Sequence, residues 1–175
     1  MALSLITVFS RGSEKKLNKI LSRVEEPMCR VPFGRVENRE EVDTIPPHFT
    51  LSSWRGKEKE RILTKIRYLR FRKFSVCVDS IDMMYGRQDS YVLYFSIRPS
   101  KALARLQNDI HALMPGASYF PGTATSHMTI CVDKDYTKIC AIKERLDARF
   151  RPFRMRISAL ELYELYPPVL LPKVD

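Results

Sequence analysis

The stretch TIPPHFTLSSW, residues 44–54, places a histidine and a threonine two positions apart directly after a pair of prolines. A proline restrains the residue before it to extended backbone, and two prolines in a row favour extended chain. We therefore predict that a strand begins at His48. Because side chains alternate across a strand, one face is expected to carry His48, Thr50, Ser52 and Trp54.

A second stretch, SHMTICV at residues 126–132, repeats the order histidine, apolar residue, threonine, apolar residue. The same alternation predicts a polar face with His127, Thr129, Cys131 and Asp133, opposite a face of apolar side chains. Two of the three histidines of the chain thus occur in one arrangement. The repeat points to a function that uses two imidazoles and two hydroxyls.

The order of the expected elements is repeated as well. Hydrophobic periodicity and turn residues predict strands over 2–9, 48–52, 74–81, 91–97, 126–132 and 153–160, and helices over 17–24, 62–69, 103–113 and 136–150. Both halves of the chain then contain strand, helix, histidine strand, helix and strand. This order makes residues 1–85 and 90–166 a candidate internal duplication.

The spacing of the motifs supports the duplication. The interval in sequence from His48 to Phe74 (74 minus 48) equals the interval from His127 to Phe153 (153 minus 127). An alternating strand pattern begins at each phenylalanine. Similar strings of elements arise by chance in many α+β chains, and the matched histidine and threonine pairs make that alternative weaker.

Length and charge restrict the class of protein. With 175 residues, 45% of them hydrophobic, the chain can bury one core, so we expect a single domain over 1–175 whose lobes, roughly 1–85 and 90–166, are not separate domains. The formal net charge of +10 favours polyanionic partners such as nucleic acid. Many soluble basic proteins with such an excess bind no polyanion, so charge alone does not decide the partner.

The cysteines and the apolar segments indicate the compartment. Cys29, Cys77, Cys131 and Cys140 lack the spacing of a zinc site and are too sparse for a disulfide framework. The apolar run at 2–9 has no basic region before it and is too short to span a bilayer. We therefore expect a soluble, cytoplasmic protein with reduced thiols and no membrane partner.

Paired imidazoles suit phosphodiester chemistry. One neutral imidazole takes a proton from the attacking water or hydroxyl while the other, protonated, gives a proton to the departing oxygen. Imidazole titrates near neutral pH, so both protonation states are accessible there. The hydroxyls of Thr50 and Thr129 would donate to the non-bridging oxygens of the phosphate. This mechanism needs neither a metal ion nor another cofactor.

The tetrapeptides HFTL at 48–51 and HMTI at 127–130 resemble the paired H-x-T-x motifs of the 2H phosphoesterase superfamily. The resemblance covers nearly the whole chain in element order, but only the two tetrapeptides in residue identity. It implies an α+β, bilobal and duplicated fold with two mainly antiparallel sheets, flanked by helices, around a central cleft. It also implies that both histidines act as acid and base and that both threonines hold the phosphate.

The activities of this family set the expected function. They include hydrolysis of 2',3'-cyclic phosphate ends, cleavage or ligation of 2'-5' linkages and cyclic phosphodiesterase action on small nucleotides. The resemblance thus implies a metal-independent phosphodiesterase with an RNA or nucleotide substrate. One departure concerns the 2'-5' RNA ligase-like branch, which often has an arginine shortly after its second motif, where this chain has CVDKD at 131–135. There Asp133 either orients a neighbouring group or, as we favour, lies at a strand end.

Aromatic residues near the motifs are candidates for base stacking, which contributes about 1–3 kcal/mol per base. Trp54 has the parity of the first polar face, and Tyr119 and Phe120 lie in the loop before the second motif. A lone tryptophan at a strand end more often covers an edge of the core. Stacking is therefore the less favoured of the two interpretations of Trp54.

The densest basic run, residues 55–73, has nine Lys or Arg in nineteen residues. Its apolar periodicity indicates the solvated face of an ordinary helix. The alternative is an electrostatic track for an RNA backbone that leads to His48, and the salt dependence of binding distinguishes the two.

Two other functions compete with the enzyme. A catalytically inactive RNA-binding module of the same fold would keep the charge without turnover, although both motifs are intact. A metal site would use His48 and His127, with Cys131 and Asp133 as the nearby additional ligands. Hydroxyls otherwise stand where carboxylate or thiolate ligands would be expected, which disfavours the metal site.

Overall fold

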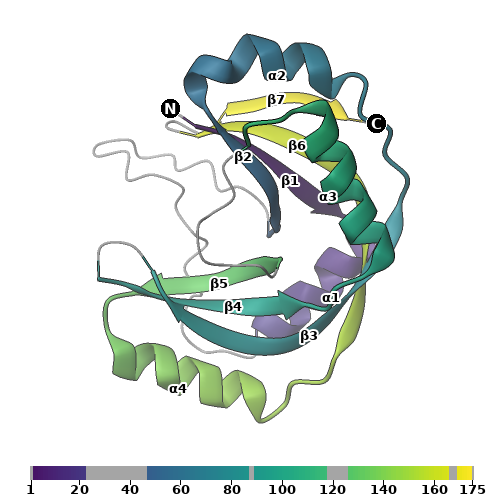
Figure 1. Ribbon diagram of the computed structural model, residues 1–175. Coiled ribbons are helices and arrows are strands. Elements are labelled where there is room, and N and C mark those ends of the chain that lie inside the picture. Colours follow the sequence, from purple (N-terminus) through teal and green to yellow (C-terminus); the bar gives the residue numbers. More distant parts are fainter. Residues whose placement is uncertain (1, 23–46, 87–88, 118–125, 166–168, 175) are drawn as a thin grey trace.

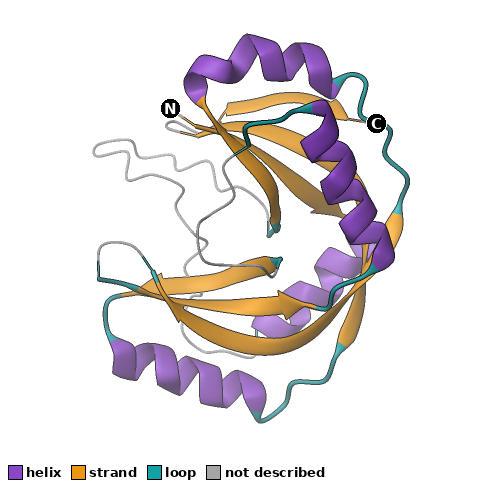
Figure 2. Cartoon of the chain, viewed as in Figure 1, coloured by secondary structure: helices purple, strands orange, loops and turns teal. Residues whose placement is uncertain are grey.

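The computed structural model describes residues 2–22, 47–86, 89–117, 126–165 and 169–174. Figure 2 shows strands of one strongly curved sheet with helices around it. None of the helices in these segments is long and apolar enough to cross a membrane.

Strands and helices follow the order predicted for the two halves of the chain (Figure 1). The elements are β1 Ala2–Phe9, α1 Arg11–Leu21, β2 Thr50–Arg55, a 3-10 turn Gly56–Glu58, α2 Lys59–Ile66, β3 Phe74–Tyr85, β4 Tyr91–Ile97, α3 Lys101–Leu113, β5 His127–Asp133, α4 Tyr136–Asp147, β6 Phe153–Leu165 and β7 Val169–Val174. The expected sequence of strand, helix, motif strand, helix and strand therefore occurs twice, and β7 follows it. The first motif strand begins at Thr50, two residues later than the predicted start at His48.

All strands of the described residues belong to a single antiparallel sheet in the order β2-β1-β6-β3-β4-β5, and β7 pairs with β6. The prediction of two separate sheets is therefore wrong. The reason is the length of β6, which covers 13 residues. Its first part, from Phe153 to Ile157, pairs with β3, and its second part, from Ile157 to Leu165, pairs with β1. Because β6 pairs with β1 on one side and with β3 on the other, it joins the two groups of strands into one sheet.

The strand order is symmetric about its centre. Exchange of β2 with β5, β1 with β4 and β6 with β3 gives the same order read from the opposite edge of the sheet. At the centre, Val76 of β3 lies opposite Met155 of β6. The two sequence halves therefore interleave, since β3 pairs with β4 and β6 pairs with β1. This pairing corrects the expected lobes of 1–85 and 90–166, because each end of the sheet contains a strand from the other half of the chain.

The symmetry extends to the pairing of individual residues. Thr50 of β2 lies opposite Ile6 of β1, and Thr129 of β5 lies opposite Tyr94 of β4. One constant shift in numbering (129 minus 50) thus relates β2 to β5, and a second (94 minus 6) relates β1 to β4. We call β2, β1 and the part of β6 paired with β1 the β2 half of the sheet, and β5, β4 and β3 the β5 half.

The helices bury apolar stripes that their sequence periodicity predicts. Their buried apolar residues are Leu17 of α1, Ile62 and Ile66 of α2, Leu103, Leu106 and Ile110 of α3, and Ile139, Ile142 and Leu146 of α4. Figure 1 shows α2 on the outer side of the β2 half and α4 on the outer side of the β5 half. The other face of each half is left for the motif side chains.

Candidate functional site

The two motif strands, β2 and β5, end the main strand order at opposite edges. His48 lies two residues before the start of β2, and His127 is the first residue of β5. Figure 1 shows the sheet curved so that these two edges turn toward each other. The pseudo-symmetry of the fold therefore places both motifs in equivalent positions.

A β-bulge interrupts the first motif strand. Leu5 of β1 lies opposite Ser52, whereas the next residue, Ile6, lies opposite Thr50. Leu51 is therefore an extra residue in β2, and an extra residue reverses the alternation of side chains beyond it.

The second motif strand has a β-bulge at the equivalent position. Leu93 of β4 lies opposite Cys131, whereas Tyr94 lies opposite Thr129, which leaves Ile130 as the extra residue. Each threonine is thus followed by one inserted apolar residue. Within the described residues, the two H-x-T-x motifs agree in register as well as in sequence.

The bulge in β2 corrects the face predicted for the first motif. Leu51 and the next residue, Ser52, are both buried, and Trp54 is 1% exposed in the hydrophobic core. Ser53 instead lies opposite Ser4, two residues before Ile6, the partner of Thr50, and so shares the face of Thr50. The prediction that Ser52 and Trp54 share the face of His48 and Thr50 is therefore wrong, because alternation was assumed to continue through Leu51.

The bulge in β5 corrects the second face in the same way. Ile130 and Cys131 are both buried, and Val132, predicted to face inward, is 36% exposed. Asp133 lies opposite Tyr91 and so belongs to the other face of the strand. The prediction that Cys131 and Asp133 share the face of His127 is therefore wrong, and neither residue is placed to join it at a metal ion.

Asp133 has the strand-end role that we favoured. Its carboxylate accepts a hydrogen bond from the backbone N–H of Asp135 at 3.0 Å and forms an ion pair with Lys138 at 3.1 Å. The hydrogen bond from Asp135, followed by that from Lys138, lowers the pKa of Asp133. This residue stabilises the turn from β5 into α4.

Hydrogen bonds hold the backbone next to each histidine. The N–H of Phe49 donates to the Thr7 hydroxyl, and the N–H of Thr7 donates to the Phe49 carbonyl, both at 3.1 Å. In the other half, the N–H of Ile97 donates to the carbonyl of Ser126 at 3.1 Å. Both histidines are themselves half-buried, so their neighbours fix the backbone while the imidazoles keep access to solvent.

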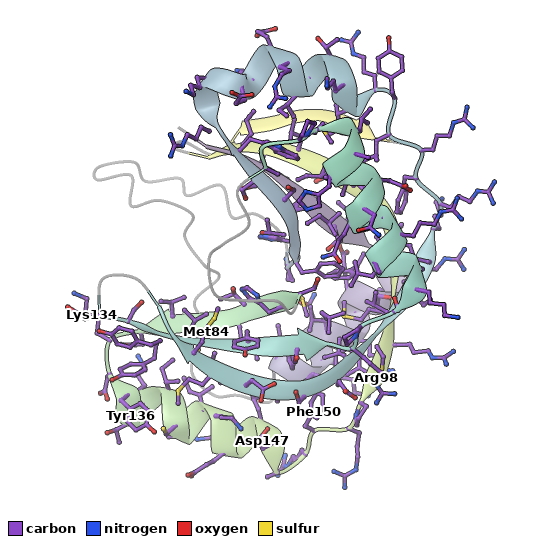
Figure 3. The ribbon with its side chains drawn as sticks, viewed as in Figure 1. Met84, Arg98, Lys134, Tyr136, Asp147 and Phe150 are labelled. Carbon is purple, nitrogen blue, oxygen red and sulfur yellow. The ribbon has the colours of Figure 1, made fainter. Side chains whose placement is uncertain are left out.

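We call the face of each half that carries Thr50 or Thr129 the threonine face. In the β5 half, Phe95 points to the other face, where its ring stacks on Phe150 with centroids 6.2 Å apart. Figure 3 shows Phe150 with α4 on the outer side of the β5 half. The threonine face of this half is therefore turned toward the β2 half.

The threonine face around His127 contains residues that sequence reasoning missed. Ser96 lies opposite His127, and the Tyr94 ring lies edge-on to the imidazole with centroids 5.2 Å apart. Asp82 of β3 lies opposite Tyr94. Burial, followed by the charge of Asp82, raises the pKa of Tyr94 and favours the neutral phenol. The alternation in YVLYFSI at 91–97 was the available signal for Tyr94.

The threonine face around Thr50 has an equivalent carboxylate. Ile6 lies between Thr50 and Glu161, as Tyr94 lies between Thr129 and Asp82. Glu161 is 5% exposed and accepts a hydrogen bond from the Tyr163 hydroxyl at 3.0 Å. Burial and this bond raise the pKa of Tyr163. In each half of the sheet, an acidic side chain therefore lies two strands away from the motif threonine, in the same row across the strands.

Of the three aromatic residues proposed for base stacking, the structure describes only Trp54. The indole N–H of Trp54 donates to the carbonyl of Met114 at 3.4 Å, and the ring is buried. Trp54 covers the core and cannot stack on a base in this structure. Tyr119 and Phe120 lie outside the described residues.

The basic run at 55–73 forms the outer helix α2 and the segments that flank it. Ile62, Ile66 and Leu69 are buried, whereas basic residues of this run, such as Arg67 and Arg70, are exposed. This division into buried apolar and exposed basic side chains fits the solvated helix face that the periodicity predicts.

A sequence model of the 2'-5' RNA ligase superfamily matches residues 19–166. The chain belongs to the 2'-5' RNA ligase superfamily. This assignment, together with the structural relatives below, confirms the resemblance to the 2H phosphoesterases. A search of curated protein sequences gives no match.

Several solved structures share the fold of this chain. E. coli LigT complexed with 3'-AMP matches 98% of this chain and 95% of its own, with a TM-score of 0.59 and 12% identity. Kluyveromyces marxianus Usb1 matches 98% and 97%, with a TM-score of 0.53 and 13% identity. TT0787 of Thermus thermophilus matches 99% and 96%, with a TM-score of 0.59 and 15% identity. At these identities the likeness shows the fold.

The superfamily assignment makes this chain a 2H phosphoesterase with both motifs intact. Within its described residues there is no group of three or more His, Cys, Asp or Glu placed to hold a metal ion. The residues that the fold brings to equivalent places are His48, Thr50, His127 and Thr129.

Proposed function

We propose that this protein is a phosphodiesterase that hydrolyses 2',3'-cyclic phosphate or 2'-5' phosphodiester bonds of RNA or nucleotides without a metal ion. The observation that carries the proposal is the equivalence of the two motifs. Thr50 and Thr129 each directly precede the extra residue of a β-bulge, and the two bulges occupy equivalent positions on opposite edges of one pseudo-symmetric sheet. The two threonine faces then form the walls of one site, with an imidazole and a hydroxyl on each.

Hydrolysis uses the two imidazoles in opposite protonation states. One of His48 and His127 accepts a proton from water as the water oxygen attacks phosphorus. The bond between phosphorus and the departing ribose oxygen breaks, and the other imidazole donates a proton to that oxygen. The hydroxyls of Thr50 and Thr129 donate hydrogen bonds to the non-bridging oxygens, where negative charge increases. Ligation is the same chemistry in reverse.

Nucleotide partners are supported by the solved relatives and by charge. Structures of E. coli LigT contain 3'-AMP, NADP+ or ATP, and a structure of Usb1 contains uridine monophosphate. The formal net charge of +10 raises the local concentration of polyanions around this chain. Both observations favour an RNA or nucleotide substrate.

The proposal is tested with 2',3'-cyclic nucleotides and a 2'-5'-linked dinucleotide in the presence of chelator. The 2'- and 3'-phosphate products are resolved for the wild type, His48→Ala and His127→Ala. We expect turnover without metal and a loss of at least about a hundredfold in kcat for either variant, since each removes an acid or a base. The product isomer identifies the oxygen that departs.

The third histidine provides a matched control. His111 lies in the last turn of α3 and outside both motifs, so His111→Ala should retain most of the activity. If the wild type binds RNA in a salt-dependent manner but shows no turnover on either substrate, the inactive RNA-binding module replaces the enzyme.

A further inference from the structure

The two threonine faces differ in the residues next to the threonines. On the threonine face of the β5 half, the row of residues next to Thr129 and Tyr94 consists of Met84 of β3, Val92 of β4 and Val132 of β5. Val92 lies opposite Met84 on one side and opposite Val132 on the other. All three are apolar, and they retain accessible surface, with Val132 at 36% exposure. We call these three residues the apolar row.

The equivalent row of the β2 half is polar. The two shifts in numbering match Val92 and Val132 to Ser4 and Ser53. Met84 lies opposite Val92 as Tyr163 lies opposite Ser4, so Tyr163 is the equivalent of Met84. The hydroxyls of Ser4 and Ser53 are 2.8 Å apart and share a hydrogen bond, and the Tyr163 hydroxyl donates to Glu161. These hydroxyls are therefore engaged with each other and with a carboxylate.

Position relates the apolar row to the site. Val132 follows Thr129 on β5, beyond the bulge, and Val92 lies two residues from Tyr94 on β4. Figure 3 shows Met84 on the β5 half, away from Phe150 and α4. An accessible apolar surface beside a phosphate-binding hydroxyl matches the division of a nucleotide into an apolar base and a charged phosphate.

We propose that the apolar row, together with the ring of Tyr94, binds the nucleobase of the substrate while the phosphate lies between the two motifs. The inference rests on the proposed function and adds an orientation to it. The base lies on the β5 half, and the polar row of the β2 half does not contact the base. The pseudo-symmetric site thus receives its substrate in one direction.

A base-free substrate tests this orientation. The value of kcat/KM measured with cyclic 2',3'-AMP is divided by the value for methyl riboside 2',3'-cyclic phosphate, which has the same phosphate but no base. For Val132→Asp, which places a charge on the apolar row, we expect this ratio to fall at least about fivefold, the lower end of what a lost base contact costs. A ratio within twofold of the wild-type value overturns the proposal.

Ser53→Asp is the matched control, because Ser53 is the pseudo-symmetric equivalent of Val132 and receives the same charge. We expect its ratio to stay within twofold of the wild-type value. A fall as large as that of Val132→Asp would show that charge anywhere near the site is sufficient, and would overturn the assignment of the base to the β5 half. Thermal midpoints of both variants verify folding.

A binding measurement separates this inference from the proposed activity. Methyl resonances of Val92 and Val132 are followed by NMR in the wild type as 2'-AMP or ribose 5-phosphate is added. We expect shifts with 2'-AMP that ribose 5-phosphate does not produce. If they occur and no phosphodiester is hydrolysed, the base site stands and the proposed function fails. If hydrolysis occurs and these methyl groups do not shift with 2'-AMP, the base site fails alone.

Discussion

The ring of Tyr94 lies edge-on to the imidazole of His127, with centroids 5.2 Å apart and planes inclined by 62°. Tyr94 is held in β4 between Asp82 and Thr129. The ring therefore forms a fixed wall against one side of the imidazole. A fixed wall matters for catalysis, because a displacement of about 1 Å at a catalytic group can lower the rate about a hundredfold.

Replacement of Tyr94 is predicted to act through the position of His127. We expect Tyr94→Ala to lower kcat about tenfold or more, since the imidazole loses this contact, and Tyr94→Phe to keep most of the activity, since the ring remains. Steady-state kinetics with cyclic 2',3'-AMP at several pH values measures both. Equal losses in the two variants would instead assign the role to the phenol hydroxyl.

Both threonine hydroxyls are predicted to stabilise the negative charge on the phosphate in the transition state. We expect Thr50→Ala and Thr129→Ala each to lower kcat by about 10²–10³, as removal of one donor to a developing oxyanion does. Serine keeps the hydroxyl, so Thr50→Ser and Thr129→Ser should recover much of the loss. If only one threonine responds, the two faces do not share the phosphate as the symmetry suggests.

Trp54 is the one tryptophan of the chain, so its fluorescence reports on its environment directly. Because the ring is 1% exposed, we expect blue-shifted emission that nucleotides do not quench. Trp54→Ala should lower the free energy of unfolding by about 3–5 kcal/mol, as truncation of a buried aromatic residue does. Quenching by nucleotide would restore the stacking interpretation that the structure disfavours.

Asp133 is predicted to make stability depend on acid pH. Its pKa is lower in the folded protein than in the unfolded chain because the Asp135 N–H, and then Lys138, favour the charged form. The contribution is therefore complete above the unfolded value of about 3.9 and disappears as pH falls through the folded pKa.

Thermal midpoints of the wild type, Asp133→Ala and Asp133→Asn across acid pH measure this contribution. We expect Asp133→Ala to be less stable at neutral pH and to approach the wild type in strong acid. Asp133→Asn keeps an acceptor for Asp135 and should lie between them. A difference that does not change with pH would assign the effect to packing instead of charge.

Much of the fold could be predicted from local pattern. Extended stretches, amphipathic helices and the repeated interval from each motif histidine to the later phenylalanine are read along the chain, so the element order and the duplication were visible in the sequence. The same holds for the motif residues His48, Thr50, His127 and Thr129. The number of sheets was not visible, because the pairing of β6 with both β1 and β3 is a contact between distant segments.

The faces of the motif strands show where local reasoning failed. Simple alternation predicts Trp54 beside Thr50 and Asp133 beside Thr129, and the bulges at Leu51 and Ile130 reverse both. A bulge is defined by the register of the partner strand, and in both motifs a helix separates that partner strand from the motif strand along the chain. Tyr94 and the apolar row were missed for the same reason, since pairing places them beside Thr129.

By itself, the sequence determined the repeated elements, the superfamily and the two histidine and threonine pairs, because these depend on residue type and local spacing. Only the tertiary structure decided that the halves interleave in one sheet, that each motif contains a bulge and that the two threonine faces differ. Those features depend on which strands pair and in what register, and pairing is settled by the burial of both halves in a common core.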